Sequence, residues 1–435
     1  MGTGLAEHIK NVVESREIGS LIIYENDMDR FLVSLYTINW QSIYDKFNVN
    51  KGQSIQFIIC QKDNYHAKFG FLWNAIINYV PQFPFTALFY NHLNDATNEK
   101  IIKDIHLGNV SFINQWGHYD DEINQYNNAR HNLLLGAKLL RPSTFKINRH
   151  IPVAIIASGP SLDDKIDLIK KYENKFLIIS CGTALGSLFK NNIKPDFHIE
   201  LESDYLVYET IKKSTSASFR KGITLLASAQ ANPKALTLFD ESLIFFKDST
   251  ALSSLFINDD EDIITHTTPT CTNAGIAFAT KLKFNNIFLF GADFGFKDLE
   301  NHHSSESIYY KEHAPKELHL ENSADLESTT TTIDVKGQVI HTKPMYLVAK
   351  IRLEECIKFS HYNGMSVYNC SDGSAIKNSH WISNNKLDNI LNDFNVAADP
   401  KKLARYIYKN SDSINVDDIN SKSQLLLDIV DTTFK

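Results

Sequence analysis

The segment IPVAIIASGPSLDD, residues 151–164, decides the fold of the larger part of this chain. Its apolar half has the continuous hydrophobic run of a strand that is buried on both faces of a parallel sheet. The run leaves through Ser158, Gly159, Pro160 and Ser161, and a predicted helix, KIDLIKKYE, follows. A strand-to-helix turn needs fewer small residues than this. The excess is typical either of a tight turn alone or of a turn that also binds a ligand, and the segment by itself leaves both open.

The alternation of short apolar strands and helices continues along the chain. It predicts an α/β fold with a central, doubly wound, Rossmann-like parallel sheet. Residues 300–345 interrupt this rhythm, and their polar composition predicts a long loop or lid with a β-hairpin around Gly337. Further strands are expected at residues 175–181, 197–203, 222–229, 242–248, 286–293 and 364–376.

The first residues predict a smaller Rossmann-like unit. Gly2 and Gly4 precede a predicted helix at 5–15, and a strand follows at 20–24, with Glu25 directly after it. This order is the second half of a βαβ unit, with its glycine loop but without the strand that normally precedes the loop. We therefore expect the chain to be an N-terminally shortened form of a longer protein.

Three regions are expected. Residues 1–148 form an N-terminal domain of α/β and helical structure that lacks its first strand, and residues 149–383 form the central domain with the large sheet. The polar, proline-containing stretch RPSTFKINRH separates the two. Residues 384–435 are expected to be a C-terminal helical region.

Composition limits the classes of function. The formal net charge of −7 does not favour a nucleic-acid partner. The five cysteines are odd in number and include no CxxC pair, which argues against a disulfide framework or a zinc site. No apolar run reaches the ~18 residues of a membrane helix, and the N-terminus lacks a secretion signal. These features predict a cytoplasmic protein without membrane insertion.

Polar residues gather where the predicted strands end, which is where open parallel sheets bind ligands. Glycine lets a backbone approach a ligand closely, and the amides at a helix N-terminus favour a phosphate. The candidates for ligand binding are Ser158, Gly159, Pro160, Ser161, Leu162, Gly182, Thr183 and Asn273. The candidates for catalysis are Glu202, Asp204, Asp293, His302 and His303.

Several candidates also have a plain structural interpretation. Ser161 can cap the helix that follows, with Asp164 three residues later, and Asn273 is a good residue for a helix N-cap. Glu200 and Glu202 share one face of a strand. Because an apolar strand does not bury two carboxylates without partners, we expect this strand end to be wet and to lie in a cleft, with a solvated edge as the alternative. The patterns of metalloproteases, P-loop enzymes, GxSxG hydrolases and kinases do not occur.

The order of these features resembles the Maf family, the motility-associated flagellin glycosyltransferases. The motifs that carry the resemblance are SGPSLD, CGTAL, PDFHIELE, TNAGIAFA and FGADFGF followed by His302 and His303. They span about residues 150–380, and the opening GTGL with LIIYENDMDRF is similar to the N-terminal domain of the family.

The resemblance implies transfer of a nonulosonic acid, pseudaminic or legionaminic acid, from its CMP-activated form to Ser or Thr hydroxyls of flagellin in the cytoplasm. It implies a central domain of the GT-A or sialyltransferase kind, whose GPSL loop holds CMP with no metal or other cofactor. Residues 159–162 would contact the nucleotide, with Gly182 and Thr183 close by. Glu202, Asp204, Asp293 and a His of the 302/303 pair would line the sugar and acceptor side. A neutral His suits the role of base, with Glu202 or Asp204 as the rival.

Two alternatives remain open from the sequence. The GPSLD loop also resembles archaeal pterin pyrophosphokinases, which use ATP and magnesium, and Glu202 and Asp204 would then be metal ligands. A non-catalytic flagellin-binding factor would bind no nucleotide. The sequence does not predict which nonulosonic acid is used, which flagellin hydroxyls accept it, or the oligomeric state.

Overall fold

The computed structural model describes the chain apart from residues 49–50, 61–64, 80–86, 94, 116–118, 249, 251–252, 254–255, 258–259, 312–313, 316–328, 395–398, 414–416 and 425–435. The chain forms two compact units, Met1–His118 and Tyr119–Lys435. None of the described helices is long and apolar enough to cross a membrane.

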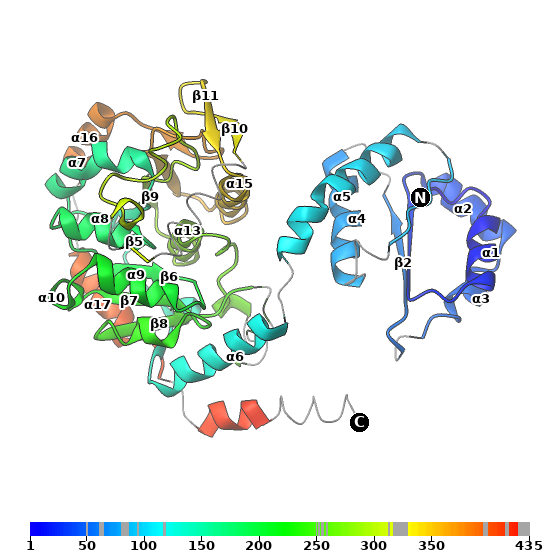
Figure 1. The fold of residues 1–435 in the computed structure, drawn as a ribbon, viewed down its shortest axis with the longest axis horizontal. Helices are drawn as coiled ribbons and strands as arrows, with labels where there is room; N and C mark the ends of the chain where they lie inside the picture. Colours follow the sequence, from blue (N-terminus) through cyan, green and yellow to red (C-terminus); the bar gives the residue numbers. More distant parts are fainter. Residues whose placement is uncertain are drawn as a thin grey trace. The chain divides into compact units, whose positions relative to one another are not determined.

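The larger unit is built on a nine-stranded sheet with the strand order β13-β12-β9-β4-β5-β6-β7-β8-β3. Figure 1 labels its strands β5, β6, β7, β8 and β9. Every neighbouring pair is parallel. The doubly wound parallel sheet predicted from the apolar runs is therefore confirmed. Its strands are β3 (Lys138–Leu139), β4 (Val153–Ile156), β5 (Leu177–Cys181), β6 (Phe197–Glu200), β7 (Thr224–Ser228), β8 (Glu241–Phe245), β9 (Asn286–Phe290), β12 (Ser366–Asn369) and β13 (His380–Trp381).

Helices cover both faces of this sheet, because successive side chains of each buried strand point to opposite faces. Val153 and Ile155 of β4 pack in one core, and Ala154 and Ile156 pack in another. The helices of the first core are α13 (Cys271–Lys281), α15 (Pro344–Phe359) and α17 (Pro400–Lys409). Those of the other face are α6 (Tyr119–Leu134), α7 (Ile166–Lys171), α8 (Ala184–Lys190), α9 (Leu206–Ser214), α11 (Pro233–Leu236) and α16 (Asn384–Asp393).

The unit boundary lies about thirty residues before the predicted one at 148. Helix α6 belongs to the larger unit, where the side-chain amide of Asn132 donates to the carbonyls of Ala229 (2.9 Å) and Ala231 (2.8 Å). The short strand β3 pairs with β8 in the large sheet. The helices α16 and α17 also pack into the cores of this unit, so the predicted C-terminal region is not a separate body.

The predicted hairpin around Gly337 is present. Strands β10 (Thr330–Ile333) and β11 (Val339–Thr342) are antiparallel, and Gly337 has a φ of +81° in the turn between them. Phe296 exchanges backbone hydrogen bonds with His341, which ties β11 to the segment after β9. Residues 312–313 and 316–328 of the predicted lid lie outside the described residues.

The smaller unit has two parallel strands, β1 (Ser20–Glu25) and β2 (Ser54–Ile59). Ile23 packs on one face of the pair and Tyr24 on the other, so that helices cover both faces in a Rossmann-like arrangement. This agrees with the predicted second α/β unit. Its helices are α1 (Glu7–Ser15), α2 (Met28–Thr37), α3 (Trp40–Tyr44), α4 (Tyr65–Tyr79) and α5 (Ala96–Gln115).

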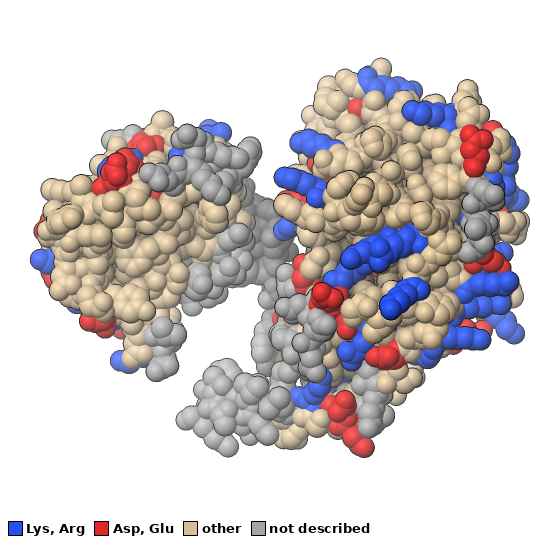
Figure 2. Space-filling view, turned by 180° about the vertical axis from the view of Figure 1, so that it is seen from behind, with Lys and Arg blue, Asp and Glu red and all other residues tan. Residues whose placement is uncertain are grey.

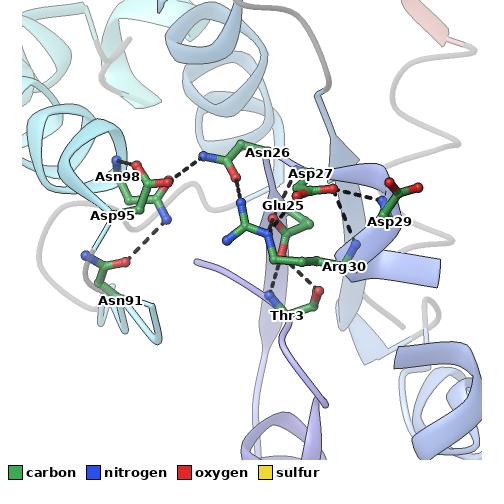
Figure 3. Close-up of polar contacts among 9 residues, drawn as sticks. All are labelled: Thr3, Glu25, Asn26, Asp27, Asp29, Arg30, Asn91, Asp95 and Asn98. Carbon is green, nitrogen blue, oxygen red and sulfur yellow. Dashed lines mark hydrogen bonds and ion pairs between the residues drawn. The ribbon is translucent and has the colours of Figure 1, made fainter. Parts of the chain in front are cut away.

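A buried carboxylate holds the glycine loop of this unit in place (Figure 3). Glu25, which is fully buried at the end of β1, accepts hydrogen bonds from the Thr3 amide (2.7 Å) and the Thr3 hydroxyl (2.9 Å). Its other oxygen accepts the amide of Asp27 (3.0 Å). Asp27 caps α2 and pairs with Arg30. Glu25, the acid at the end of β1, thus gives its hydrogen bonds to the glycine loop and to the start of α2.

Charged side chains are distributed differently on the two units. Figure 2 shows Lys and Arg side chains interspersed with Asp and Glu over the described surface of the larger unit, seen from the side opposite to Figure 1. The described surface of the smaller unit is mainly uncharged in this view. The excess negative charge of the chain is therefore not gathered into one patch on this side.

The attachment of α6 gives a first prediction. Asn132→Ala leaves two buried carbonyls without their donor, and each such loss costs about 1–3 kcal/mol. We expect the free energy of unfolding of the larger unit to fall by about 2–4 kcal/mol in urea denaturation. The control is Asn124→Ala, an exposed asparagine on the same helix. Equal stability of the two variants would contradict the attachment.

Candidate functional site

The candidate site lies at the point in the sheet where the strand order reverses. From β4 the chain continues to β5 on one side, and from β9 it continues to β12 on the other side, while β4 and β9 are neighbours. Open α/β sheets bind ligands at the carboxyl ends of strands at such a switch point. The loop after β4 and the loop after β9 meet here, and the Gly159 amide donates to the Gly291 carbonyl (2.9 Å).

The two loops touch so closely that there is no space for side chains at their glycines. A Cβ atom on Gly159 would lie 2.2 Å from Oδ2 of Asp293 and 2.4 Å from the Gly291 carbonyl oxygen. A Cβ atom on Gly373, after β12, would lie 2.4 Å from the Asp293 carbonyl oxygen. The small residues after β4 are therefore required by the packing of one loop on the next. Of the two interpretations that the sequence left open, the tight turn is therefore part of the explanation of these small residues.

Asp293 is the centre of this packing. Its Oδ2 atom accepts the amide of Ser161 (3.0 Å), and the residue is 4% exposed. Burial raises the pKa of Asp293 to about 6, the Asp372 carboxylate adds to the rise, and the hydrogen bonds from Ser161 oppose it. The sequence placed Asp293 on the sugar and acceptor side. In the structure it lies beneath the Gly159 loop and shapes that loop instead.

The predicted cap by Ser161 is not formed. Residues Pro160–Lys165 are a 3-10 turn whose N-cap is Gly159, without a side-chain cap. Ser161 is buried, and Leu162 is fully buried in the hydrophobic core. Only Ser158, Gly159 and Pro160 of the predicted nucleotide loop are partly exposed. They are therefore the part of the loop that a ligand can reach.

The turn after β5 joins the same site, as the sequence predicted. Gly182 has a φ of +53°, and the Thr183 hydroxyl donates to the Ser158 hydroxyl oxygen (2.9 Å). Both residues are partly exposed. The structure thus brings together the small polar residues that follow β4 and β5.

The histidine pair reaches the site from the loop after β9. The Ser304 amide donates to the Ser158 carbonyl (2.8 Å), which places His303 beside the β4 loop. His302 is buried against Phe296 and Tyr310, with ring centroids 5.8 Å apart in each case. His303 stacks on Tyr309 with 4.2 Å between the ring centroids.

His303 is held as a neutral imidazole. Burial, with smaller contributions from His302 and Lys343, lowers the pKa of His303 to about 3. The Tyr346 hydroxyl lies 3.5 Å from its Nε2 atom. A neutral imidazole can accept a proton at its unprotonated nitrogen. This is the protonation state that suits the role of base.

The acidic end of β6 differs from the prediction. The strand ends at Glu200, whose carboxylate is buried and pairs with Nε2 of His198 (3.0 Å) and with the Cys271 thiol (3.7 Å). Glu200 is therefore part of an internal network and does not line a wet cleft. Glu202 and Asp204 lie beyond the strand and are exposed, and Asp204 accepts the Leu206 amide (2.6 Å).

Asn273 has a structural role rather than the predicted ligand contact. It is fully buried and forms a capping box with Thr270, the N-cap of α13. Its side-chain amide donates to the Ala349 carbonyl of α15 (2.8 Å). The oxygen of this side chain thus caps its own helix, and the amide group ties that helix to α15.

Two charged residues of the site were missed by the sequence analysis. Asp163 accepts hydrogen bonds from the histidine loop, and Lys165, which is 2% exposed, pairs with Asp372 (3.2 Å). Both belong to the stretch DDK directly after the GPSL motif. A charged run after a turn is normally solvated, so only its position beside the motif could have indicated these contacts.

Two family models match the chain. The model described as the glycosyltransferase Maf N-terminal domain matches residues 1–107, and the model described as 6-hydroxymethylpterin diphosphokinase MptE-like matches residues 123–299. The first match lies within the smaller unit, and the second covers the N-terminal part of the larger unit.

The chain is also similar to a solved structure and to a curated protein. The structure is a Maf glycosyltransferase from Magnetospirillum magneticum AMB-1, with a TM-score of 0.70, 23% identity, and coverage of 94% of this chain and 60% of that one. The curated protein, from Treponema pallidum (strain Nichols), is uncharacterized and is 30% identical over 74 residues, 17% of this chain and 35% of its own length. The chain thus spans less than two thirds of the length of each.

The structural similarity shows that the fold of both units is that of the solved Maf glycosyltransferase. The Maf N-terminal model covers the smaller unit, where GTGL and LIIYENDMDRF carried the resemblance. The resemblance to the Maf family that the sequence motifs carried is thus confirmed by the N-terminal model over residues 1–107, and the solved structure agrees with it in fold.

Proposed function

We propose that this chain is a glycosyltransferase that moves a nonulosonic acid, pseudaminic or legionaminic acid, from its CMP-activated form to Ser or Thr hydroxyls of flagellin, for flagellum assembly and motility. The similarity to the Maf N-terminal domain and to the fold of a solved Maf glycosyltransferase supports the glycosyltransferase activity. The observation that carries the proposal is the meeting of three loops at the switch point, where Ser158 contacts both Thr183 and Ser304. The loops bring a neutral histidine next to a surface of small polar residues.

The chemistry fits the groups that are present. Ser158, Gly159, Pro160, Gly182 and Thr183 form the accessible surface that would hold the CMP phosphate. Backbone amides and hydroxyl groups there can stabilise the charge that develops on CMP as it leaves, so that no metal is required. Ser161, Leu162 and Asp293 support this surface from beneath.

We assign the catalytic base to His303, with His302 behind it. With a pKa of about 3, the His303 imidazole is neutral near pH 7, so one of its two ring nitrogens is free to accept a proton. A bound anionic donor favours the protonated imidazole and so raises its proton affinity when the acceptor hydroxyl is attacked. Glu202 and Asp204 are weaker candidates, because they follow β6, which lies two strands from β4.

The match to an MptE-like pterin diphosphokinase over residues 123–299 supports a second candidate, an ATP and magnesium enzyme. In that case Glu202 and Asp204 would hold the metal. The smaller unit favours the glycosyltransferase, since its matching model is that of Maf. A flagellin-binding factor without catalysis is the third candidate.

Calorimetric titration with CMP, and separately with ATP, with and without magnesium, separates these candidates. We expect CMP to bind without a metal. Binding of ATP only with magnesium would favour the diphosphokinase, and binding of neither nucleotide would favour the binding factor.

Gly159→Ala tests whether the packed loop is the nucleotide site. The φ of Gly159 is −68°, which any residue adopts, so the substitution acts only through the clash of the new Cβ atom with Asp293 and the Gly291 carbonyl oxygen. We expect CMP affinity to fall by about tenfold or more. Gly19→Ala is the control, because a Cβ atom there meets nothing within 4 Å. Unchanged affinity in Gly159→Ala would place CMP elsewhere.

His303→Gln should separate binding from catalysis. We expect kcat for sugar transfer to flagellin to fall by about 10²–10⁴-fold, the usual contribution of a general base, while CMP affinity stays within about twofold. His131→Gln, at an exposed histidine of α6, should leave both unchanged. A His303→Gln enzyme with the activity of the wild type would exclude His303 as the base.

Asp293→Asn tests the loop-holding role through the pH dependence of stability. The folded chain keeps the proton of Asp293 to a higher pH than the unfolded chain does, since the pKa is about 6 rather than about 3.9. This group therefore stabilises the fold at low pH, and about 3 kcal/mol is lost as the pH rises from about 4 to about 6. Denaturation at several pH values should show this loss in the wild type and in Asp164→Asn, but not in Asp293→Asn. The same slope in all three proteins would contradict the assignment.

A further inference from the structure

The loop that carries His303 is fastened to the loop after β4 by one carboxylate. Asp163 accepts the Ser304 hydroxyl at Oδ1 (2.6 Å) and the Ser305 amide at Oδ2 (2.9 Å). The Ser304 amide donates to the Ser158 carbonyl (2.8 Å). Three hydrogen bonds thus join two consecutive residues of one loop to the other loop.

The burial of Ser304 shows that its contact with Asp163 belongs to the packed interior. Ser304 is 1% exposed, and its hydroxyl also lies 3.3 Å from that of Ser187 in α8. A buried hydroxyl needs a hydrogen-bond partner, and a carboxylate is a strong acceptor for it. Removing the Asp163 side chain would leave both the hydroxyl and the Ser305 amide without this acceptor.

The same contacts determine where His303 lies. His303 directly precedes Ser304, its amide donates to the Tyr310 hydroxyl (2.9 Å), and its ring lies on Tyr309. The tyrosines hold the histidine from the C-terminal part of its own loop. Asp163 and Ser158 are the groups that relate that loop to the strand end where the nucleotide would bind.

We propose that Asp163 is a positioning residue, which sets His303 at the reacting centre by clamping Ser304 and Ser305 to the loop after β4. This inference rests on the proposed function for the identity of the reaction. It assigns Asp163 no contact with the substrate. Since Asp163 belongs to the 3-10 turn at Pro160–Lys165, the nucleotide loop and the base are held as one assembly. A base that is displaced by about 1 Å loses much of its rate while substrate binding is kept.

Asp163→Ala tests the clamp, with Asp164→Ala as its matched control. Asp164 is the next residue and is also an exposed aspartate, but its carboxylate forms no hydrogen bond with the described residues. Amide hydrogen exchange of the full chain should be faster at Ser304 and Ser305 in Asp163→Ala by about tenfold, the value for one net hydrogen bond. The control should exchange as the wild type does. Unchanged exchange in Asp163→Ala would overturn the clamp.

Kinetics with the same variants test the positioning role. We expect Asp163→Ala to lower kcat by about tenfold or more, with the donor KM and the CMP affinity within about twofold of the wild type. Ser304→Ala keeps the hydrogen bond from its backbone amide to the Ser158 carbonyl, and it should show a smaller loss of kcat. Faster exchange with an unchanged kcat, or a loss confined to KM, would overturn the positioning role. A wild-type chain without transfer activity would count against the proposed function, and the exchange measurement would still decide the clamp.

Discussion

The arrangement of the larger unit depends on the close contact between the ends of β4 and β9. Gly159, Gly291 and Gly373 meet around Asp293 with no space for a Cβ atom at Gly159 or Gly373. Because the loops lie against one another, the amide of Ser161 reaches the Asp293 carboxylate and the Ser304 amide reaches Ser158. The reversal of strand order makes these strands neighbours, and the glycines allow their loops to pack together.

The strands β4 to β9 and β12 could be predicted from the sequence because they are largely buried on both faces and mainly apolar, whereas the two-residue strands β3 and β13 gave no such signal. Helix α6 was placed in the wrong domain for a related reason. It is polar and rich in asparagine, and amides such as that of Asn132 attach it to backbone carbonyls of the sheet. Hydrogen bonds of this kind leave no hydrophobic periodicity, so a boundary drawn from composition alone could not include the helix.

Positions in the site could be predicted better than roles. Ser158, Gly182, Thr183 and the histidine pair were placed at one edge by the rule for strand ends, and the structure brings them together. The rule does not say which way a side chain points. Glu200 turns inward to His198 of its own strand and to Cys271, and Asn273 bonds to Ala349; Cys271 and Ala349 are buried or partly buried partners far away in the sequence. Asp163 was missed because it is an exposed aspartate, and nothing in the sequence indicates that a distant serine donates to it.

The two units use the same physical device at their glycine loops. In the smaller unit Glu25 accepts the Thr3 amide, and in the larger unit Asp293 accepts the Ser161 amide. Each carboxylate is buried close to the carboxyl end of a strand and gives its hydrogen-bonding capacity to the loop. An acid engaged in this way is buried beneath its loop and has less capacity left for a ligand. The charge of a ligand at the larger site would therefore be met by loop amides, hydroxyl groups and a neutral histidine, which are the groups suited to an anionic leaving group.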